Sequence, residues 1–374
     1  MSKINRRTFN KYLLFSVPVL SCPGLSCCVS GPYNRINNIR SEFLNEEENF
    51  ILHYASMAPS GHNAQPWLIY KNKSKNWFLA VDSKRVLEAV DPDRRETLLS
   101  LGCFVENLSI AASCKGYAAN IKFDSATDSN DIVAEIILSK QIVKGSDKEI
   151  LSLLSKRRTI RTGHLDRKVS TFSMDKTEIE SENIFFYDSH SQQGKKISEL
   201  TFESNQLQIS RLEAQKELAD WIRWSDEDIV RYRDGLNPET LELSSFQQAW
   251  TKRFYTRSDV LTKRFKNASL KKVKEQLSSF GGWLVISSES NSPEDLLNAG
   301  RRAERLWIKA QKYKLAVHPM SQALEERKTK ELLKKALRPK GEIQFLLRVS
   351  HIDNYPAPIS PRRPVSWFVY QYQH

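Results

Sequence analysis

Residues 101–112 read LGCFVENLSIAA, and they have a partial copy further along the chain, at residues 299–310, which read AGRRAERLWIKA. Aligned without gaps, the two stretches share Gly, Glu, Leu, Ile and Ala in the same order. In the first stretch, apolar residues recur with the spacing of one helix face. Both stretches precede a turn and a strand-like run, as a duplicated unit would require. We therefore predict two buried helices that meet at an interface between two related halves.

The segments around these helices alternate between helical and extended patterns, which predicts an α+β fold. In the first part of the chain we expect helices at residues 40–57 and 94–115 and strands at 66–70, 77–81, 120–123 and 134–138. In the second part we expect helices at 148–156, 192–223 and 293–313 and strands at 184–187, 283–287 and 343–349. This gives a first half at residues 40–145 and a second half at residues 146–374, with a long charged insertion at about 225–275.

The composition excludes several classes of protein. Of the 374 residues, 40% are apolar and 10% are aromatic, which is enough to bury a core, and a single short apolar run near the start excludes a polytopic membrane protein. The seven histidines are dispersed, and the sequence contains no C-x-x-C or H-E-x-x-H motif, so we expect no metal site. The formal net charge of +13 could indicate a nucleic-acid partner, but the basic residues are spread along the chain and we expect none.

Residues 1–30 are typical of an export signal. An Arg-Arg pair at positions 6–7 precedes an aromatic residue, and the apolar stretch 12–20 is too short to span a bilayer as a mature helix. The pattern resembles a twin-arginine signal, which predicts export to the periplasm. Two endings compete: either Cys22 or Cys27 is lipidated and anchors the protein to a membrane facing the periplasm, or a peptidase cleaves nearby without lipidation. A frayed cytosolic N-terminus is the remaining alternative.

Three polar segments are candidates for ligand binding. Residues 58–67 read APSGHNAQPW, a loop whose hydroxyl, amide and backbone N–H groups can hydrogen-bond a planar, acceptor-rich ligand, although such a loop can also be a surface turn. Residues 156–164 read KRRTIRTGH, and guanidinium groups give paired, charge-assisted hydrogen bonds to phosphate. The alternative for this run is a solvated basic linker. The third segment, residues 360–364, reads SPRRP.

In this order, with a Gly-x-x-x-Glu helix between them, these segments resemble the nitroreductase superfamily of FMN-dependent flavoproteins. The resemblance spans roughly residues 45–370 and includes the stretches ADWIRW (219–224), RDGL (233–236) and AVHPMSQAL (316–324). The single-chain layout is similar to the Acg-like members with a twin-arginine signal, in which two nitroreductase-like halves are fused. The resemblance implies a monomer whose two halves form an intramolecular pseudo-dimer, each half a mixed, mostly antiparallel sheet flanked by helices.

The resemblance also implies one FMN site between the two halves. Ser60 and Asn63 would contact the flavin or ribityl chain, the arginines of residues 157–161 would serve the phosphate, ribityl chain or flavin edge, and the 362–363 pair would complete a phosphate clamp. His62 and His318 are either ligands or satisfied loop histidines. The full set of cofactor-binding residues implied is Pro59, Ser60, His62, Asn63, Arg157, Arg158, Thr159, Arg161, His318, Pro319, Met320, Arg362 and Arg363. Because neither motif has a second copy, the pseudo-symmetric second site should be empty.

The activity implied is that of an FMN-dependent oxidoreductase, which passes hydride or electrons to a small acceptor such as a nitroaromatic or a quinone. NAD(P)H is a candidate donor. The flavin carries this chemistry, so no catalytic side chain is assigned. The insertion at about 225–275 could act as a lid that either shapes a small substrate site or excludes NAD(P)H from the flavin. The alternative function is therefore a flavin-storing or flavin-sequestering protein without turnover.

Overall fold

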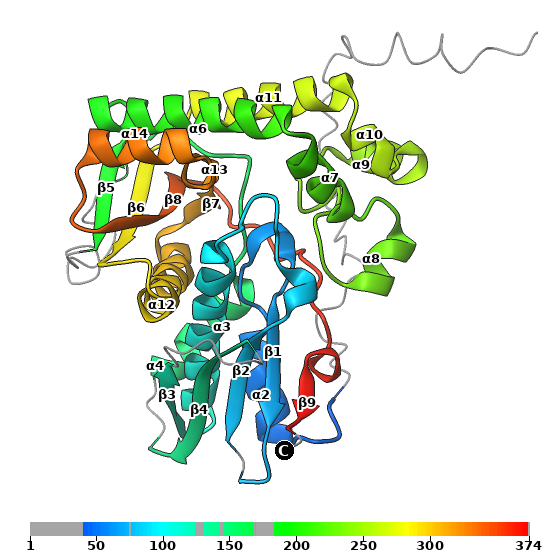
Figure 1. Ribbon diagram of the computed structural model, residues 1–374, viewed down its shortest axis with the longest axis vertical. Helices are drawn as coiled ribbons and strands as arrows, with labels where there is room; N and C mark the ends of the chain where they lie inside the picture. The colour runs from blue at the N-terminus through cyan, green and yellow to red at the C-terminus, as the bar shows by residue number, and fades with distance from the viewer. Residues whose placement is uncertain are drawn as a thin grey trace, which may run out of the picture. The chain divides into compact units, whose positions relative to one another are not determined.

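The structure is a computed structural model that describes residues 40–74, 76–123, 131–142, 146–167, 169 and 183–372. The expected export signal at residues 1–30, with its candidate lipidation cysteines, lies outside the described residues. The described chain is a mixed α and β structure with one five-stranded sheet and one four-stranded sheet (Figure 1).

The first sheet has the strand order β3-β4-β2-β1-β9. Its strands are β1 (Trp67–Lys71), β2 (Trp77–Val81), β3 (Tyr117–Phe123), β4 (Ile132–Lys140) and β9 (Val369–Gln371). The hairpin of β1 and β2 is antiparallel and pairs Trp67 with Val81, as its strand pattern predicts. Strand β9 instead runs parallel to β1, so the end of the expected second half, residues 146–374, contributes a strand to the first sheet.

One face of the first sheet is covered by helices α2 (Glu46–Ala55) and α3 (Arg95–Cys114), which share a core with it. Helix α2 starts at a capping box, in which Asn45 accepts from the backbone N–H of Glu48 and the Glu48 carboxylate accepts in return. Helix α3 has the length and apolar composition of a membrane-spanning helix. Its apolar residues are nevertheless buried against the sheet, as in the core helix of a globular domain.

The second sheet has the order β5-β6-β8-β7 and is antiparallel throughout. Its strands are β5 (Ile184–Asp188), β6 (Gly282–Ser288), β7 (Leu315–Pro319) and β8 (Glu342–His351). Helix α12 (Pro293–Ala310) packs on one face, while α6 (Gln192–Ser210) and α14 (Arg327–Leu337) pack on the other. Strand β6 is buried along its whole length because both faces of the sheet are covered.

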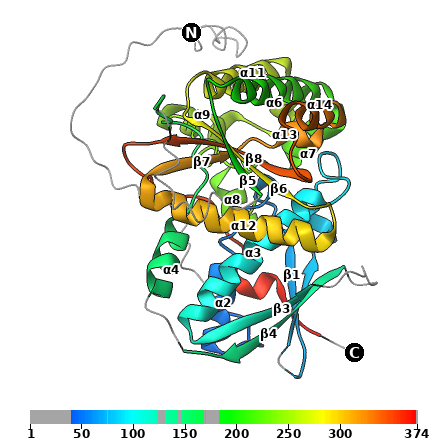
Figure 2. The ribbon, with the colours of Figure 1, turned by 90° about the vertical axis from the view of Figure 1, so that its left-hand side faces the viewer.

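The two repeat helices, α3 and α12, cross in contact with each other (Figure 2). The crossing point is formed by Gly102 and Gly300, which occupy the same position in the repeat. A Cβ atom on Gly102 would lie 2.1 Å from the carbonyl oxygen of Leu297, and one on Gly300 would lie 2.1 Å from that of Leu99. Only glycine allows this approach, so the shared glycine of the sequence repeat has a direct packing role.

The remaining segments differ from the expected elements in three places. The expected helix 192–223 is interrupted at Arg211, whose backbone is extended, and continues as α7 (Leu212–Asp220). The insertion forms α8 (Asp226–Tyr232), α9 (Ser245–Phe254), α10 (Arg257–Val260) and α11 (Lys263–Ser278). Strand β7 is the strand-like run expected after residues 299–310, whereas strand β9, α13 (Gln322–Glu325) and α14 were not expected. The other elements are α4 (Ser146–Lys156) and the 3₁₀ turns Gly61–Asn63, Ser83–Arg85, Gln311–Tyr313 and Val365–Trp367.

Candidate functional site

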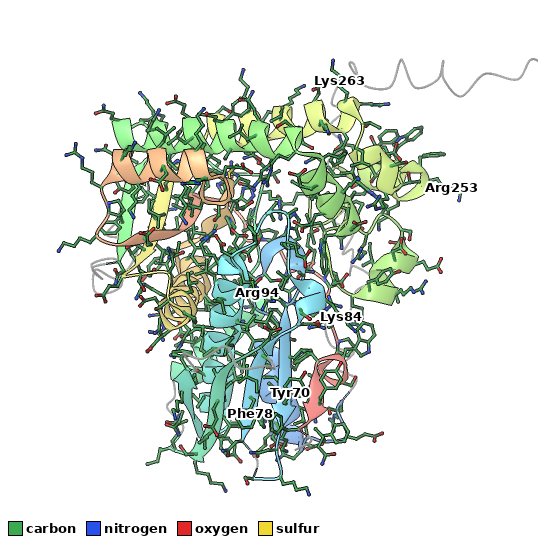
Figure 3. The ribbon with its side chains drawn as sticks, in the orientation of Figure 1. Tyr70, Phe78, Lys84, Arg94, Arg253 and Lys263 are labelled. Carbon is green, nitrogen blue, oxygen red and sulfur yellow. The ribbon has the colours of Figure 1, made fainter. Side chains whose placement is uncertain are left out.

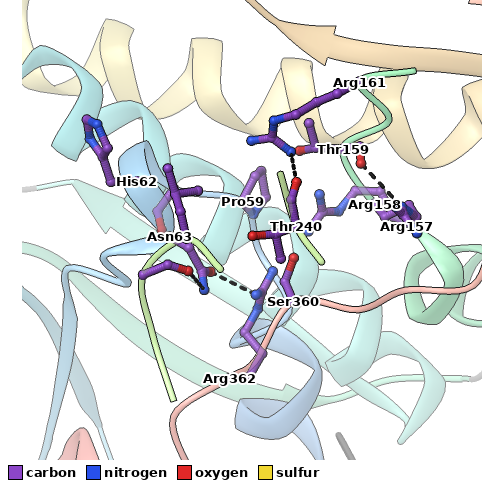
Figure 4. Close-up of a pocket in the computed structure, with 13 residues that line it drawn as sticks. Pro59, His62, Asn63, Arg157, Arg158, Thr159, Arg161, Thr240, Ser360 and Arg362 are labelled. Carbon is purple, nitrogen blue, oxygen red and sulfur yellow. Dashed lines mark hydrogen bonds between the residues drawn. The ribbon is translucent and has the colours of Figure 1, made fainter. Parts of the chain in front are cut away.

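Four segments that are distant in sequence surround one cavity (Figure 4). They are the loop at residues 59–63, the arginine run at 157–161, part of the insertion at 235–240 and the C-terminal tail at 360–362. The cavity contains about 500 Å³ of empty space, including its opening to solvent. Its lining residues are Pro59, Ser60, His62, Asn63, Arg157, Arg158, Thr159, Arg161, Gly235, Leu236, Thr240, Ser360 and Arg362.

The loop that follows Pro59 has an unusual backbone. His62, Asn63 and Gln65 have φ angles of 48°, 55° and 57°, in the left-handed region that side chains other than glycine and asparagine rarely adopt. The Oγ of Ser60 accepts a hydrogen bond of 2.9 Å from the backbone N–H of Gln65 and so closes the loop. Backbone strain of this kind persists only where the surrounding structure enforces it, and it is common at ligand sites.

Two other segments enforce this loop conformation. The Asn63 side chain donates to the carbonyl of Gly235 at 3.1 Å, and its Oδ1 accepts from Nη1 of Arg362 at 2.8 Å. The Gln65 side chain donates to the carbonyl of Arg233 at 2.9 Å and accepts from the backbone N–H of Arg363 at 2.9 Å. The amide of Asn63 therefore joins the insertion to the C-terminal tail.

Arg157 is buried within the wall of the cavity. Its Nε lies 2.9 Å from Oε1 of Glu304, which is fully buried, and its Nη2 donates to the carbonyl of Met57. Its guanidinium also lies 5.0 Å from the ring centre of Trp307. Burial raises the pKa of Glu304 to about 7, although the nearby Arg157 acts in the opposite direction. Arg157 thus ties the cavity wall to α12.

Arg158 and Arg161 are organised around one carboxylate, that of Glu242. Nη2 of Arg158 donates to Oε1 of Glu242 at 2.5 Å, and the backbone N–H of Arg161 donates to its Oε2 at 3.0 Å. The Arg161 guanidinium itself donates to the carbonyl of Thr240 at 2.7 Å, as Figure 4 shows. The Arg161 guanidinium therefore keeps donors for a ligand, whereas the Arg158 guanidinium is already paired.

The described lining of the cavity contains four arginines and no Asp or Glu, and carboxylates behind the lining pair with two of them, Arg157 with Glu304 and Arg158 with Glu242. Burial lowers the pKa of Arg161 to about 10, with Arg158 acting in the same direction and Glu242 opposing it, so this side chain remains a cation at neutral pH. Burial also lowers the pKa of His62 to about 4, assisted by Arg161, which leaves the imidazole neutral. Nδ1 of His62 is buried and has no hydrogen-bond partner within the described chain. Such a lining fits an anionic ligand that carries hydrogen-bonding groups.

The structure brings together nine of the thirteen residues that the sequence analysis proposed for FMN. They are Pro59, Ser60, His62, Asn63, Arg157, Arg158, Thr159, Arg161 and Arg362. The other four residues do not line the cavity. Met320 is buried in the core of the second sheet. Arg363 points elsewhere and donates to the carbonyls of Gln65 and Trp67. Pro319 and His318 lie in β7. His318 is buried, and burial lowers its pKa, with the charges of Arg348 and Arg161 acting in the same direction.

The sequence analysis did not assign five residues that build this site. Gly235, Leu236, Thr240 and Ser360 line the cavity, and Glu242 holds the arginine run. Two of them, Gly235 and Leu236, belong to the RDGL stretch that carried part of the family resemblance. That stretch was a signal for a role near the site. Glu242 and Thr240 lie in no motif, and only the folded insertion brings them to the arginines.

Comparison with known proteins gives three relatives of interest, while no protein-family model matches the chain. The chain is 24% identical over 346 residues to a Serratia sp. (strain ATCC 39006) protein named a probable NAD(P)H nitroreductase, PigM, with 83% of this chain and 90% of that protein covered. It is 23% identical over 326 residues to an uncharacterized protein of Mycobacterium tuberculosis, covering 83% and 89%. A shorter match, 39% over 69 residues, covers 18% of this chain and 20% of an M. tuberculosis protein provisionally named NAD(P)H nitroreductase acg.

These relatives, at low identity, support a nitroreductase-like oxidoreductase. The mixed α and β structure with two sheets is compatible with a nitroreductase-like fold. Because the first two relatives are covered over nearly their whole length, the likeness extends across both sheets rather than to one motif.

Proposed function

We propose that this protein binds FMN in the cavity and transfers hydride or electrons through it to a small acceptor such as a nitroaromatic or a quinone. The observation that carries the proposal is a cavity lined by four arginines, of which Arg161 keeps guanidinium donors for a ligand, with no carboxylate among the described residues of its lining. A phosphate monoester is the kind of group that this donor set suits. The relatives named as NAD(P)H nitroreductases favour NAD(P)H as the electron donor.

The residues present fit FMN by the chemistry of their donors. Arg161 would hold the phosphate or the flavin edge, because its guanidinium is cationic and keeps donors for a ligand. The hydroxyls of Ser60, Thr159 and Ser360 line the same cavity and suit the ribityl chain. Bound FMN would supply the redox chemistry, and the protein would bind, orient and shield it. The cation at Arg161 would stabilise negative charge that develops in the cavity.

The proposal is tested with the purified full chain. We expect the protein to take up FMN in a saturable titration and to lose the flavin absorbance when NAD(P)H is added without oxygen. Addition of a nitroaromatic or a quinone should then restore the absorbance. A chain that remains colourless and does not bind FMN at micromolar concentration would overturn the proposal.

One substitution tests the role of Arg161. We expect Arg161→Gln to weaken FMN binding about 10- to 100-fold, because one charge-assisted hydrogen bond contributes about 1.5 to 3 kcal/mol. Isothermal titration measures the affinity, and denaturant unfolding shows whether the fold is intact. The matched control is Arg301→Gln, an arginine on α12 that pairs with Glu106 and does not line the cavity. Equal FMN affinities for both variants would show that Arg161 does not contribute to FMN binding.

The second candidate function, flavin storage, is favoured by one observation. Gly235, Leu236 and Thr240 of the insertion form part of the cavity lining, so the insertion lies beside any ligand held there. A donor that cannot stack on the flavin cannot transfer hydride to it. In that case the FMN-loaded protein would be photoreducible but inert to NAD(P)H, a result that separates storage from turnover.

We also propose that α3 and α12 relate two fused halves as an intramolecular pseudo-dimer and that the chain is a monomer. The contact of the repeated glycines supports this arrangement. Light scattering on the purified protein should give the mass of one chain, and the mass of two chains would overturn the monomer.

Export by a twin-arginine signal remains a proposal as well. Mass spectrometry of the mature N-terminus tests cleavage, and it distinguishes a free terminus from a lipidated cysteine.

A further inference from the structure

Helix α9 turns an aromatic stripe towards solvent. Phe246, Trp250 and Phe254 lie four residues apart and stack in sequence, with ring centres 6.4 Å and 4.3 Å apart. Phe246 is 63% exposed and Phe254 is 54% exposed, although large aromatic side chains of globular proteins are ordinarily covered. The stripe is therefore a candidate contact surface.

The opposite side of α9 holds the helix to the protein. Thr251 on this side is buried. Gln248 donates to the carbonyl of Leu243, and Lys252 forms ion pairs with Asp226 and Glu239. The polar side of the helix thus faces inward and the apolar side outward, which is the reverse of the usual arrangement for a helix on a globular core.

Basic residues are frequent in the sequence around the aromatic stripe. Residues 245–266 contain six Lys or Arg and one acidic residue, and two of the six are paired outside this range, Lys252 with Asp226 and Glu239 and Arg257 with Asp220. Among the basic residues, Arg253, Lys263 and Arg264 are exposed. Figure 3 shows Arg253 and Lys263 projecting outward from the corner where α9, α10 and α11 lie. An outward apolar stripe accompanied by exposed cations, here Arg253 on the same helix and Lys263 and Arg264 at the start of α11, is typical of a surface that lies in the interface of an anionic membrane.

We propose that α9, with Phe246, Trp250, Phe254, Arg253, Lys263 and Arg264, forms a surface that docks on an anionic lipid bilayer. The aromatic rings would enter the interfacial region, where Trp and Phe partition well, while the basic side chains extend to the phosphate headgroups. Charge complementarity selects this occupant. A second copy of the chain would bring the same cations against each other, and like charges across an interface are repulsive.

This inference does not depend on FMN. Helix α9 begins three residues after Glu242, so a docked helix would hold the insertion that forms one wall of the cavity near the membrane surface. The binding of lipid and the binding of flavin are measured separately, so that failure of one does not decide the other.

The test uses the purified full chain and sedimentation with vesicles. One set of vesicles is phosphatidylcholine alone, and the other is phosphatidylcholine mixed with phosphatidylglycerol. The aromatic variant is Phe246→Ser with Phe254→Ser, and the charge variant is Arg253→Glu with Lys263→Glu. The matched control is Ile137→Ser, which removes an exposed apolar side chain, 43% exposed, from β4. Every variant keeps residues 1–39, so any vesicle binding by that segment is the same in all of them.

We expect the wild-type chain to bind the anionic vesicles more than about tenfold better than the neutral ones, and to lose this preference at high salt. The aromatic variant should lose at least about tenfold in partitioning, the charge variant should lose the anionic preference, and the control should behave as wild type. FMN uptake and denaturant unfolding should be unchanged in the variants, which shows that the loss is not a loss of fold. Equal binding by the wild type and both variants would overturn the proposal. Dimerisation that depends on Phe246 and Phe254, without vesicle binding, would assign the surface to a second copy and would also overturn it.

Discussion

The folded protein disfavours the ionised form of the Glu304 carboxyl group. It is fully buried on α12, and the charged groups around it are Arg157, Arg362 and Glu106. Burial raises its pKa from about 4.5 to about 7. The folded chain therefore binds more protons than the unfolded chain between these two values. The stability that the neutral carboxyl contributes is present below about pH 4.5 and is lost as the pH rises through 7.

Glu304→Gln tests this cost of burial, because the glutamine side chain stays neutral at every pH. We expect the variant to match wild type at pH 4 and to be more stable at pH 8, by up to about 3 kcal/mol. Urea unfolding at both pH values measures the difference. The control is Glu294→Gln, an exposed carboxylate on the same helix, which should show no such pH dependence. A variant that is less stable than wild type at pH 8 would mean that the Arg157 ion pair outweighs the cost of burial.

Single residues also show how much of the site can be predicted from sequence. The arginines at 157–161 and the loop at 59–63 were identifiable because each forms a short, dense motif, and the structure places both on one cavity. The role of Glu242 was not identifiable from the sequence, because Glu242 lies outside any motif in a charged insertion. Its backbone has a left-handed φ of 54°, a conformation that a glycine in the sequence would have indicated. Met320 was assigned to the FMN site because its neighbours belong to a motif. Side chains alternate in direction along an extended segment, and the side chain of Met320 lies in the core.

At the scale of elements, the crossing of α3 and α12 depends on two glycines. A methyl group on Gly300 would meet the carbonyl of Leu99 at 2.1 Å, so Gly300→Ala must push the helices apart. We expect it to lower the free energy of unfolding by about 2 to 3 kcal/mol, even though alanine favours the helix itself. Denaturant unfolding measures this. Gly163→Ala is the control, since nothing lies within 4 Å of its added methyl group and only the positive φ of 72° opposes it, at about 1 kcal/mol. Equal losses in the two variants would mean that the helices adjust freely.

The same elements indicate where sequence patterns stop predicting structure. Strands β1 and β2 and helix α3 were identifiable because their apolar periodicity is long and is bounded by turn residues. Strand β9 has three residues, too few for any period, and it exists because β1 offers it an open edge. The break at Arg211 also has no glycine or proline to mark it, and the helices on its two sides pack in different clusters, α6 against the second sheet and α7 against other segments.

At the scale of the whole described chain, the C-terminal tail connects the cavity to the core of the first sheet. Arg362 binds the loop through Asn63, and Arg363 holds the carbonyls of Gln65 and Trp67. A few residues later, Phe368 is fully buried beside Phe104, and its carbonyl accepts from the backbone N–H of Ile69. The position of the cavity wall is thus fixed by packing that lies outside the cavity.

Phe368→Ala tests this connection, because it removes a buried ring without touching any residue of the cavity lining. We expect it to lower the free energy of unfolding by about 3 to 5 kcal/mol. We also expect weaker FMN binding, since the tail that carries Ser360 and Arg362 loses its anchor. Far-UV circular dichroism and flavin fluorescence should report one coincident unfolding transition, because α12, the tail and the first sheet share a core. Tyr370→Ala, two residues further along in β9 and 45% exposed, should change neither quantity appreciably. Two separate transitions, or unchanged FMN affinity in a destabilised Phe368→Ala protein, would show that the cavity is held by its own contacts and not by the C-terminal strand.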